Sequence, residues 1–128
     1  MEVIDSEDFK ELLKGEKELF VVSFFTNSCP NCTTITNVFN EILIDTSFKV
    51  FKINAETEYE LVKDFELLGV PTTLFYRHGF LVAKKLGVKS KSSLIKTIKK
   101  FQAFTEGEAE EYSKKSLLSK MISGWLKK

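Results

Sequence analysis

The sequence has almost no excess charge and no long apolar run. Lysine and arginine together number 19 and aspartate and glutamate 18, so the formal charge is +1 and no overall field would gather nucleic acid or an acidic surface. No apolar run approaches the roughly 18 residues that a membrane span needs, and the first residues lack the basic and apolar regions of a secretory signal. We therefore expect a cytoplasmic protein without a nucleic-acid partner, although a chain that begins after a cleaved signal would look the same.

Soft metal ligands are also scarce. The chain has two cysteines, Cys29 and Cys32, and one histidine, His78, whereas a structural zinc site needs about four ligands. A zinc site would need a second chain, so we expect neither a metal nor a cofactor. His78 lies in an Arg-His-Gly sequence typical of a turn, and we expect it to be an exposed turn residue. A reducing compartment disfavours a purely structural disulfide, so a catalytic role fits the two cysteines better.

The apolar residues follow helix and strand patterns. Residues 19–25 are nearly all β-branched or aromatic, which is typical of a central strand covered on both faces. Helical spacing predicts helices from Asp5 or Ser6 to Gly15, from the cysteines to about Ile44, over 58–68, and after Ser90. Further strands are predicted over 48–53, 72–76 and 80–86, of which the last two form an antiparallel hairpin. This alternation predicts the α/β class.

Cys29 lies where the central strand gives way to the second helix. A helix N-terminus offers unpaired amide donors and the positive end of the helix dipole, and both stabilise a thiolate. We therefore expect the pKa of Cys29 to fall below the free value of about 8.5, which makes Cys29 the nucleophile and Cys32, one turn further on, the shielded resolving thiol. The two-residue spacing lets Cys32 attack the mixed disulfide at Cys29 and release the substrate. Pro30 occupies the first helical turn, where its missing N–H is no loss.

With these motifs in order, the chain resembles the thioredoxin family over about residues 3 to 104. The matching segments are 20–25 before the redox motif, 50–54 in the next strand, 70–72 (Val-Pro-Thr) before the hairpin, and Gly87. The resemblance implies a thioredoxin fold, a central mixed sheet flanked by helices. It also implies a thiol–disulfide oxidoreductase that acts on protein or small-molecule disulfides and receives electrons from a disulfide reductase. A glutaredoxin-like enzyme would also carry Cys-Pro-x-Cys, but the extra N-terminal helix and the long stretch from Cys32 to the proline are thioredoxin-like.

The same resemblance implies that Pro71 is cis and packs against the sulfurs. Without it, Pro71 could simply open an ordinary trans strand. A proline there offers no N–H to compete for the cysteines, and the backbone of Val70 is left to pair with an extended substrate. The residues expected to line this contact surface are Ser28, Ala55, Val70, Gly87 and Val88.

Three positions depart from the family pattern. Ser28 replaces the aromatic residue that usually precedes the first cysteine, and Asn31 replaces the proline before the second. Ser23 aligns with the family's buried acid, and a neutral hydroxyl cannot serve as a carboxylate base for the resolving thiol. Lys52, the usual neighbour of that acid, is retained, although a lysine at a strand edge can simply be solvated.

The composition changes after Phe104, so we expect a thioredoxin-like domain over 1–104 and an appendage over 105–128. The appendage starts with an acidic stretch that predicts a linker or a helix start, followed by a basic amphipathic helix. Its apolar face comprises Leu117, Leu118, Met121, Ile122, Trp125 and Leu126. This face could dock on its own domain, on a partner or second copy, or on an anionic membrane surface. A binding or scaffold module that acts through this helix is therefore the alternative to an enzyme.

Overall fold

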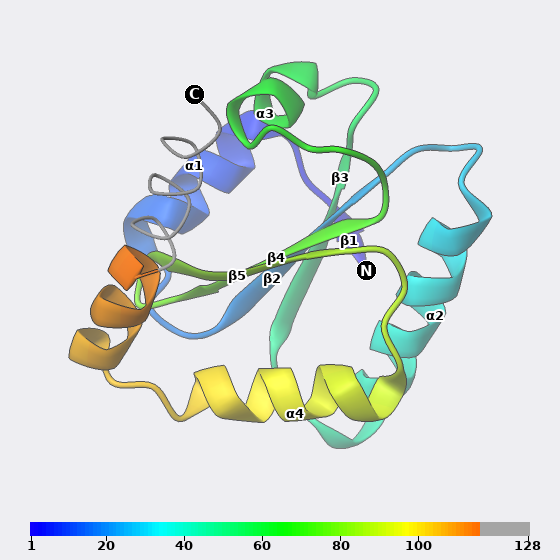
Figure 1. The fold of residues 1–128 in the computed structure, drawn as a ribbon. Coiled ribbons are helices and arrows are strands. Elements are labelled where there is room, and N and C mark those ends of the chain that lie inside the picture. Colours follow the sequence, from blue (N-terminus) through cyan, green and yellow to red (C-terminus); the bar gives the residue numbers. More distant parts are fainter. Residues whose placement is uncertain (116–128) are drawn as a thin grey trace, which may run out of the picture.

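In a computed structural model of the protein, the described residues are 1–115, so the apolar face predicted at Leu117–Leu126 lies outside them. Five strands form one sheet in the order β1-β3-β2-β4-β5 (Figure 1). The strands are β1 (Glu2–Val3), β2 (Phe20–Phe25), β3 (Lys49–Asn54), β4 (Thr72–Arg77) and β5 (Phe80–Leu86). β1, β3 and β2 are parallel, whereas β4 is antiparallel to β2 and β5. The predicted mixed sheet, its central strand and its hairpin are confirmed.

Four labelled helices cover the two faces of the sheet. They are α1 (Ser6–Gly15), α2 (Pro30–Asp45), α3 (Tyr59–Asp64) and α4 (Lys91–Gln102). Figure 1 shows α1 and α3 on one side of the sheet and α2 and α4 on the other. The core is divided in the same way, because alternate residues of β2 point to opposite faces. Val21 packs in the cluster that includes residues of α2 and α4, whereas Phe20, Val22 and Phe24 pack in the cluster that includes residues of α1 and α3.

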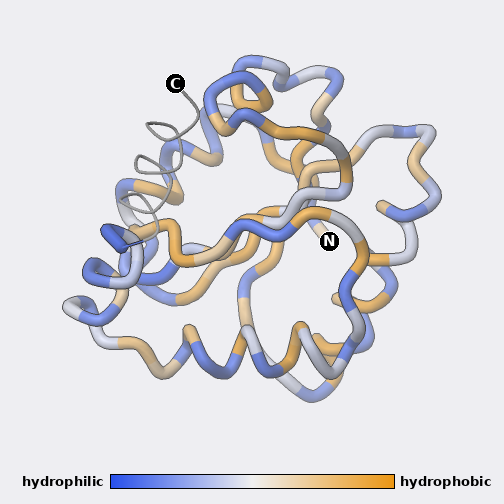
Figure 2. The backbone as a smooth tube through the Cα atoms, viewed as in Figure 1, coloured by the Kyte–Doolittle hydropathy of each residue, from blue (hydrophilic) through white to orange (hydrophobic). Residues whose placement is uncertain are grey.

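The central strand is apolar on both faces because both are covered. Residues Phe20, Val21, Val22 and Phe24 are fully buried, which explains why no polar alternation interrupts this segment. In Figure 2 the sheet strands are mostly in the hydrophobic colour, while the helices alternate between the two colours as each presents one face to the core. The apolar pattern of residues 20–25 therefore reflects a central strand with helices on both faces of the sheet.

The predicted helix over 58–68 is wrong at its end. α3 stops at Asp64, Phe65 caps it, and Glu66 has a left-handed φ of 51°. The turn lets the Phe65 ring pack against Phe9, with 5.9 Å between the ring centroids, and it leaves Leu68 90% exposed instead of on a buried helical face. Apolar spacing alone could not reveal this, because the apolar pattern continues past the point where the backbone leaves the helix.

Two smaller differences concern β1 and His78. No local sequence pattern predicts β1, whose two exposed residues pair with Phe51 and Lys52 of β3. His78 lies in the predicted turn, but it is half-buried. Its backbone N–H donates to the carbonyl of Lys17 at 2.8 Å, and its Nε2 lies 3.1 Å from the carbonyl oxygen of Phe104. These partners come from segments distant in sequence, so the turn pattern could not predict them.

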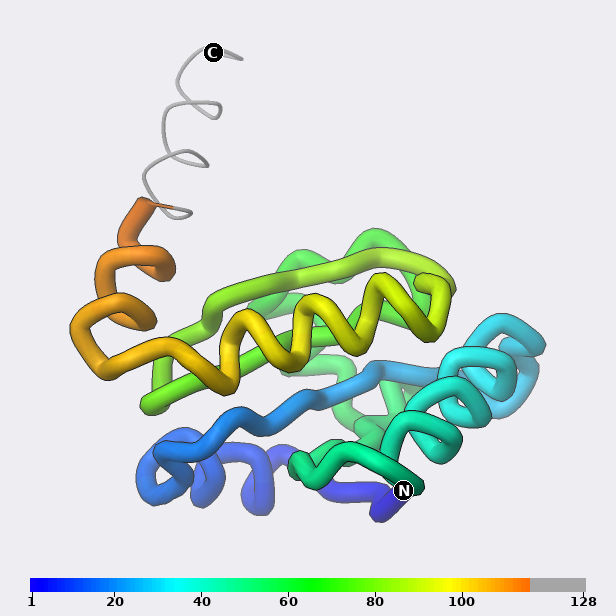
Figure 3. Tube along the Cα trace, turned by 90° about the horizontal axis from the view of Figure 1, so that it is seen from below, coloured from blue at the N-terminus to red at the C-terminus, as the bar shows by residue number. Residues whose placement is uncertain are grey.

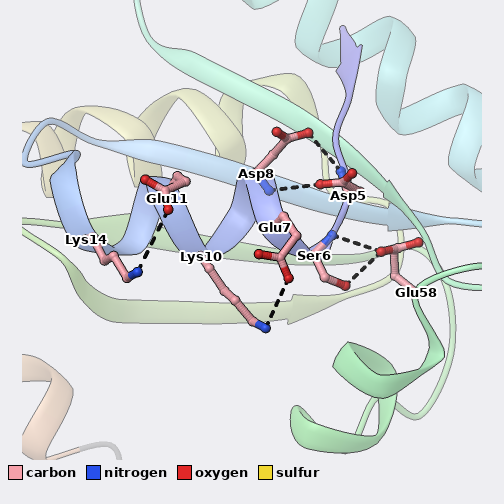
Figure 4. Close-up of polar contacts among 8 residues, drawn as sticks. All are labelled: Asp5, Ser6, Glu7, Asp8, Lys10, Glu11, Lys14 and Glu58. Atoms are coloured by element: carbon pink, nitrogen blue, oxygen red, sulfur yellow. Dashed lines mark hydrogen bonds and ion pairs between the residues drawn. The ribbon is translucent and has the colours of Figure 1, made fainter.

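The start of α1 is fixed by side-chain hydrogen bonds (Figure 4). The Asp5 carboxylate accepts from the backbone N–H of Asp8 at 2.9 Å, and the backbone N–H of Asp5 donates to the Asp8 carboxylate at 3.2 Å. Ser6 donates from its N–H and its hydroxyl to one oxygen of Glu58, at 2.9 and 2.7 Å. The bond from the Ser6 side chain is the main reason why the pKa of the Glu58 carboxyl lies below its ordinary value.

We predict that Ser6→Ala destabilises the protein at neutral pH but not in acid. A carboxyl whose pKa is lowered by folding stabilises the fold above its ordinary pKa of 4.5, and this contribution is lost as the pH falls through the lower folded-state value. Urea midpoints of the wild type and the variant should therefore differ at pH 7 and converge toward about pH 3. Ser47→Ala, at an exposed serine between α2 and β3, is the control. A difference that persists in acid would show that Ser6 acts without the Glu58 charge.

A further helix over residues 106–115, called here the C-terminal helix, follows α4. Thr105 caps it, since its hydroxyl accepts from the N–H of Glu108 at 3.2 Å while its own N–H donates to the Glu108 carboxylate at 3.0 Å. Figure 3 shows the helix turning away from the axis of α4. Ala109 is fully buried, and the Tyr112 ring packs edge-on against Phe101. The acidic stretch is thus a helix start, whereas the domain boundary near Phe104 stays a prediction.

Candidate active site

The two cysteines lie at the join of β2 and α2. Cys29 is the N-cap residue of α2, with extended backbone angles, and Pro30 is the first helical residue. Cys29 and Cys32 form a disulfide with 5.3 Å between their Cα atoms. Cys29 is half-exposed and Cys32 is only 4% exposed. A partner can therefore reach Cys29 more easily than Cys32.

The helix start provides a hydrogen-bond donor for the Cys29 sulfur. The backbone N–H of Cys32 donates to Cys29 Sγ at 3.1 Å, and the first turn of α2 holds no acidic residue. This N–H and the positive end of the helix dipole favour a negative charge on Cys29 when the disulfide opens. The site is thus arranged to stabilise a thiolate at Cys29.

The turn before β4 lies against the disulfide. The Val70–Pro71 peptide bond is cis, as the resemblance implies, and Cys29 Sγ lies 3.8 Å from the carbonyl oxygen of Val70. Pro71 is buried, and its carbonyl accepts a hydrogen bond from the N–H of Gly87 at 2.8 Å. Gly87 has a φ of +87° and ample space around it, so the backbone conformation is what favours glycine there. The Val70–Pro71 turn thus lies beside Cys29 and is held from its other side by Gly87.

The other residues expected on the contact surface lie in the loops after β2, β3 and β5. Ser28 is exposed, Ala55 is half-buried with its N–H donating to the carbonyl of Phe25 at 2.8 Å, and Val88 is 39% exposed. The sequence interpretation missed Glu56, whose carboxylate accepts from the backbone N–H of Asn27 at 3.2 Å, two residues before Cys29. No local sequence pattern points to that bond, because it joins two loops.

Exposed leucines next to the turn were also missed. Leu68 is 90% exposed and Leu86 50% exposed. The Leu86 side chain lies over Gly69, since a Cβ on Gly69 would be 3.6 Å from Leu86 Cδ1. The apolar surface beside Val70 is therefore wider than expected. The available signal was the Leu-Leu-Gly sequence directly before Val70.

Ser23 and Lys52 lie side by side in the sheet behind the helix start. Ser23 is 2% exposed and is paired in register with Lys52 of β3 and Thr73 of β4. Lys52 is half-buried, and its Nζ lies 4.5 Å from the centre of the Phe25 ring. Thr73 is 1% exposed, and its hydroxyl has no hydrogen-bond partner within the described chain. The sequence alone does not single out Thr73, because only the strand register shows that Thr73 lies beside Ser23.

Neither a metal-binding cluster nor a membrane span occurs within residues 1–115. In that part of the chain, no three histidine, cysteine, aspartate or glutamate side chains are grouped so that they could hold a metal ion. No described helix has the length and apolar character to cross a membrane.

Sequence comparisons agree with this geometry. A profile of the thioredoxin family matches residues 1–100. Thioredoxins of Rickettsia bellii and Mycoplasmoides gallisepticum are 28% and 26% identical to the chain over 98 residues, which cover 75% and 76% of the chain and 92% and 97% of the relatives. A Mycobacterium leprae protein named bifunctional thioredoxin reductase/thioredoxin is 26% identical over 100 residues, which cover 77% of the chain and 22% of that longer protein.

Solved structures give the same match. A reduced thioredoxin of Schistosoma mansoni superposes with a TM-score of 0.67 and 25% identity, over 79% of this chain and 94% of the other. A thioredoxin of Halobacterium salinarum superposes with a TM-score of 0.72 over 81% of this chain and 92% of the other, and its 17% identity supports the fold alone.

Proposed function

The chain belongs to the thioredoxin family and is a thiol–disulfide oxidoreductase, and from this premise we propose that Cys29 is the nucleophile and Cys32 the resolving thiol. The observation that carries the assignment is the difference in position. Cys29 is half-exposed at the cap of α2 and accepts a backbone hydrogen bond, whereas Cys32 is buried one turn further on. A thiolate must be accessible to attack a substrate, and a resolving thiol only has to reach Cys29.

The reaction proceeds in two exchanges. The Cys29 thiolate attacks one sulfur of a substrate disulfide, the substrate S–S bond breaks, and the first substrate thiolate leaves and takes up a proton. The Cys32 thiolate then attacks Cys29 Sγ, which breaks the mixed disulfide and releases the second substrate thiol. The substrate gains two electrons and two protons, and Cys29 and Cys32 are left oxidised to the disulfide.

Substrate recognition is assigned to the surface around the Val70–Pro71 turn. The Val70 backbone would pair with an extended substrate segment that carries the disulfide, as a strand added beside the turn. Ser28, Ala55, Gly87 and Val88 would line the same surface. Pro71 keeps a competing N–H away from the sulfurs, and Pro30, Asn31, Ser23 and Lys52 support the two cysteines from the helix and the sheet.

The partners are proposed from the same chemistry. The substrates are disulfides of proteins or small molecules, and a disulfide reductase returns electrons to Cys29 and Cys32. The M. leprae relative, whose name joins a reductase and a thioredoxin in one protein, supports this kind of donor. We place the reaction in the cytoplasm, where thiols are kept reduced and a regenerating donor is present. The alternative is a scaffold module that acts through the C-terminal segment. It is not favoured, because Cys29 and Cys32 form a disulfide beside the cis Val70–Pro71 bond, and Gly87 donates a hydrogen bond to Pro71.

An insulin-reduction assay with dithiothreitol tests the activity. The wild type should accelerate the reduction and precipitation of insulin, whereas Cys29→Ser should leave only the background rate of dithiothreitol. Cys32→Ser tests the resolving step in the same assay and should turn over much more slowly than the wild type. Equal rates with and without the wild-type protein would contradict the activity and favour the scaffold alternative.

We also predict a disulfide more oxidising than that of a general thioredoxin, whose potential is about −270 mV. Asn31 supplies a backbone N–H and a side-chain amide where general thioredoxins have proline. Donors to the Cys29 thiolate stabilise the reduced form and raise the potential. Equilibration with glutathione redox buffers measures it. A value at or below about −270 mV would show that the N–H absent at Pro30 outweighs the donors gained at Asn31.

A further inference from the structure

A polar row crosses the sheet on the face that α2 and α4 cover. The strand register places Lys52, Ser23, Thr73 and Lys85 side by side on β3, β2, β4 and β5. Two residues away along the strands, the neighbouring row contains Val50, Val21 and Phe75, which belong to the core cluster under α2 and α4. Since side chains alternate along a strand, the polar row faces the same helices.

The centre of the row is buried but polar. Ser23 is 2% exposed and Thr73 1% exposed, in strands whose other inward residues are mostly apolar. The Thr73 hydroxyl is buried and has no hydrogen-bond partner in the described part of the chain. An unsatisfied buried hydroxyl costs stability that a valine of nearly the same shape would not cost. Within the described chain, the Thr73 hydroxyl is therefore uncommitted and can donate to a group that lies over this row.

Cys32 lies on α2, one of the two helices that cover this face of the sheet. Cys32, Ile35, Phe39 and Ile42 form the buried stripe of α2, and the last three pack in the cluster with Val21 and Phe75. α2 connects the parallel strands β2 and β3, so it runs back along the sheet, and its first turn lies over the end of β2. The direction along α2 from Ile35 to Cys32 is therefore the same as the direction along β2 from Val21 to Ser23. This direction places Cys32 at the end of the buried stripe that is on the side of Ser23 and Thr73.

We propose that Thr73 donates the hydrogen bond that stabilises the Cys32 thiolate in the resolving step, directly or through one water, where relatives of this fold would use a carboxylate. The inference rests on the proposed assignment of Cys32 as the resolving thiol. The Cys32 proton leaves to solvent, Thr73 keeps its own proton and shares it with the sulfur, and the thiolate attacks Cys29 Sγ. Ser23 lies beside Thr73 as a second hydroxyl. Lys52 and Lys85 flank the pair, and the first turn of α2 holds no acidic residue, so nothing in the row opposes a thiolate.

The test is the titration of Cys32 in the full-length chain with Cys29→Ser, followed by the ultraviolet absorbance of the thiolate. Adding Thr73→Val should move the midpoint of thiolate formation up by about one pH unit, the size expected for losing one hydrogen bond to a charged group. Thr73→Ser, which keeps the hydroxyl, should leave the midpoint nearly unchanged. Thr73→Ala also removes the hydroxyl and adds no bulk. It should therefore raise the midpoint as Thr73→Val does, which separates the loss of the hydroxyl from any effect of valine on the packing.

Kinetics give a second readout. With both cysteines present, Thr73→Val should slow the release of substrate from the mixed disulfide about tenfold at neutral pH. In the Cys32→Ser chain, the same substitution should not change the rate at which the mixed disulfide forms. An unmoved midpoint in both Thr73→Val and Thr73→Ala, or an equal shift in Thr73→Ser, would overturn the inference. The titration needs no substrate, so its outcome is separate from whether the protein reduces disulfides.

Discussion

A Cys32→Ser chain mixed with a disulfide-bonded protein accumulates a covalent complex through Cys29, and turnover falls by on the order of a thousandfold or more. The reason is that Cys29, half-exposed at the cap of α2, can still attack, whereas the buried thiol that would release the substrate is gone. Non-reducing gels detect the complex, and peptide mass spectrometry locates the linked residue.

The matched control is Cys29→Ser, which retains the buried Cys32 and should give no complex. Iodoacetamide provides an independent check, since reduced wild-type protein should be modified first at Cys29. Complexes that form through Cys32, or faster labelling of Cys32, would reverse the two assignments.

A chain that ends at Phe104 is expected to be less stable than the full chain by about 2–4 kcal/mol. It loses the C-terminal helix, including the fully buried Ala109 and the Tyr112 ring, whose centroid lies 5.5 Å from that of Phe101 and 5.4 Å from that of Phe104. Urea unfolding at constant m-value measures the difference.

Two variants separate the causes of that loss. A chain that ends at Lys115 keeps the described helix and should be more stable than the chain that ends at Phe104. Tyr112→Ala should reproduce part of the loss in the full chain. Equal midpoints for the chains ending at Phe104 and Lys115 would support the domain boundary predicted near Phe104.

The elements predicted best from the sequence are those whose signal is local and continuous. The 19–25 run is apolar except for Ser23, because both faces of β2 are covered. Asp5 and Ser90 accept hydrogen bonds from backbone N–H groups three residues on, as N-caps do. α3 was predicted too long because its end depends on the left-handed conformation of Glu66. The turn at Glu66 accompanies the contact of the Phe65 ring with Phe9, and the spacing of apolar residues does not encode that contact.

The same distinction applies to the site. Cys29 and Cys32 can be recognised from the sequence because both belong to one short motif, Cys-Pro-Asn-Cys. The approach of Val70 to Cys29 joins residues 41 apart in sequence, so only the resemblance to thioredoxins pointed to it. Thr73 required the strand register, which places it beside Ser23, and neither composition nor motif spacing contains that information.

The most direct test of the central claim is the electron balance during a single turnover. Reduced protein is mixed with a disulfide-bonded substrate, the reaction is quenched with acid, free thiols are alkylated, and Cys29 and Cys32 are quantified by mass spectrometry. We predict one Cys29–Cys32 disulfide for each substrate disulfide reduced, preceded by a transient mixed disulfide at Cys29. Substrate reduction that leaves both cysteines as alkylated thiols would contradict the account.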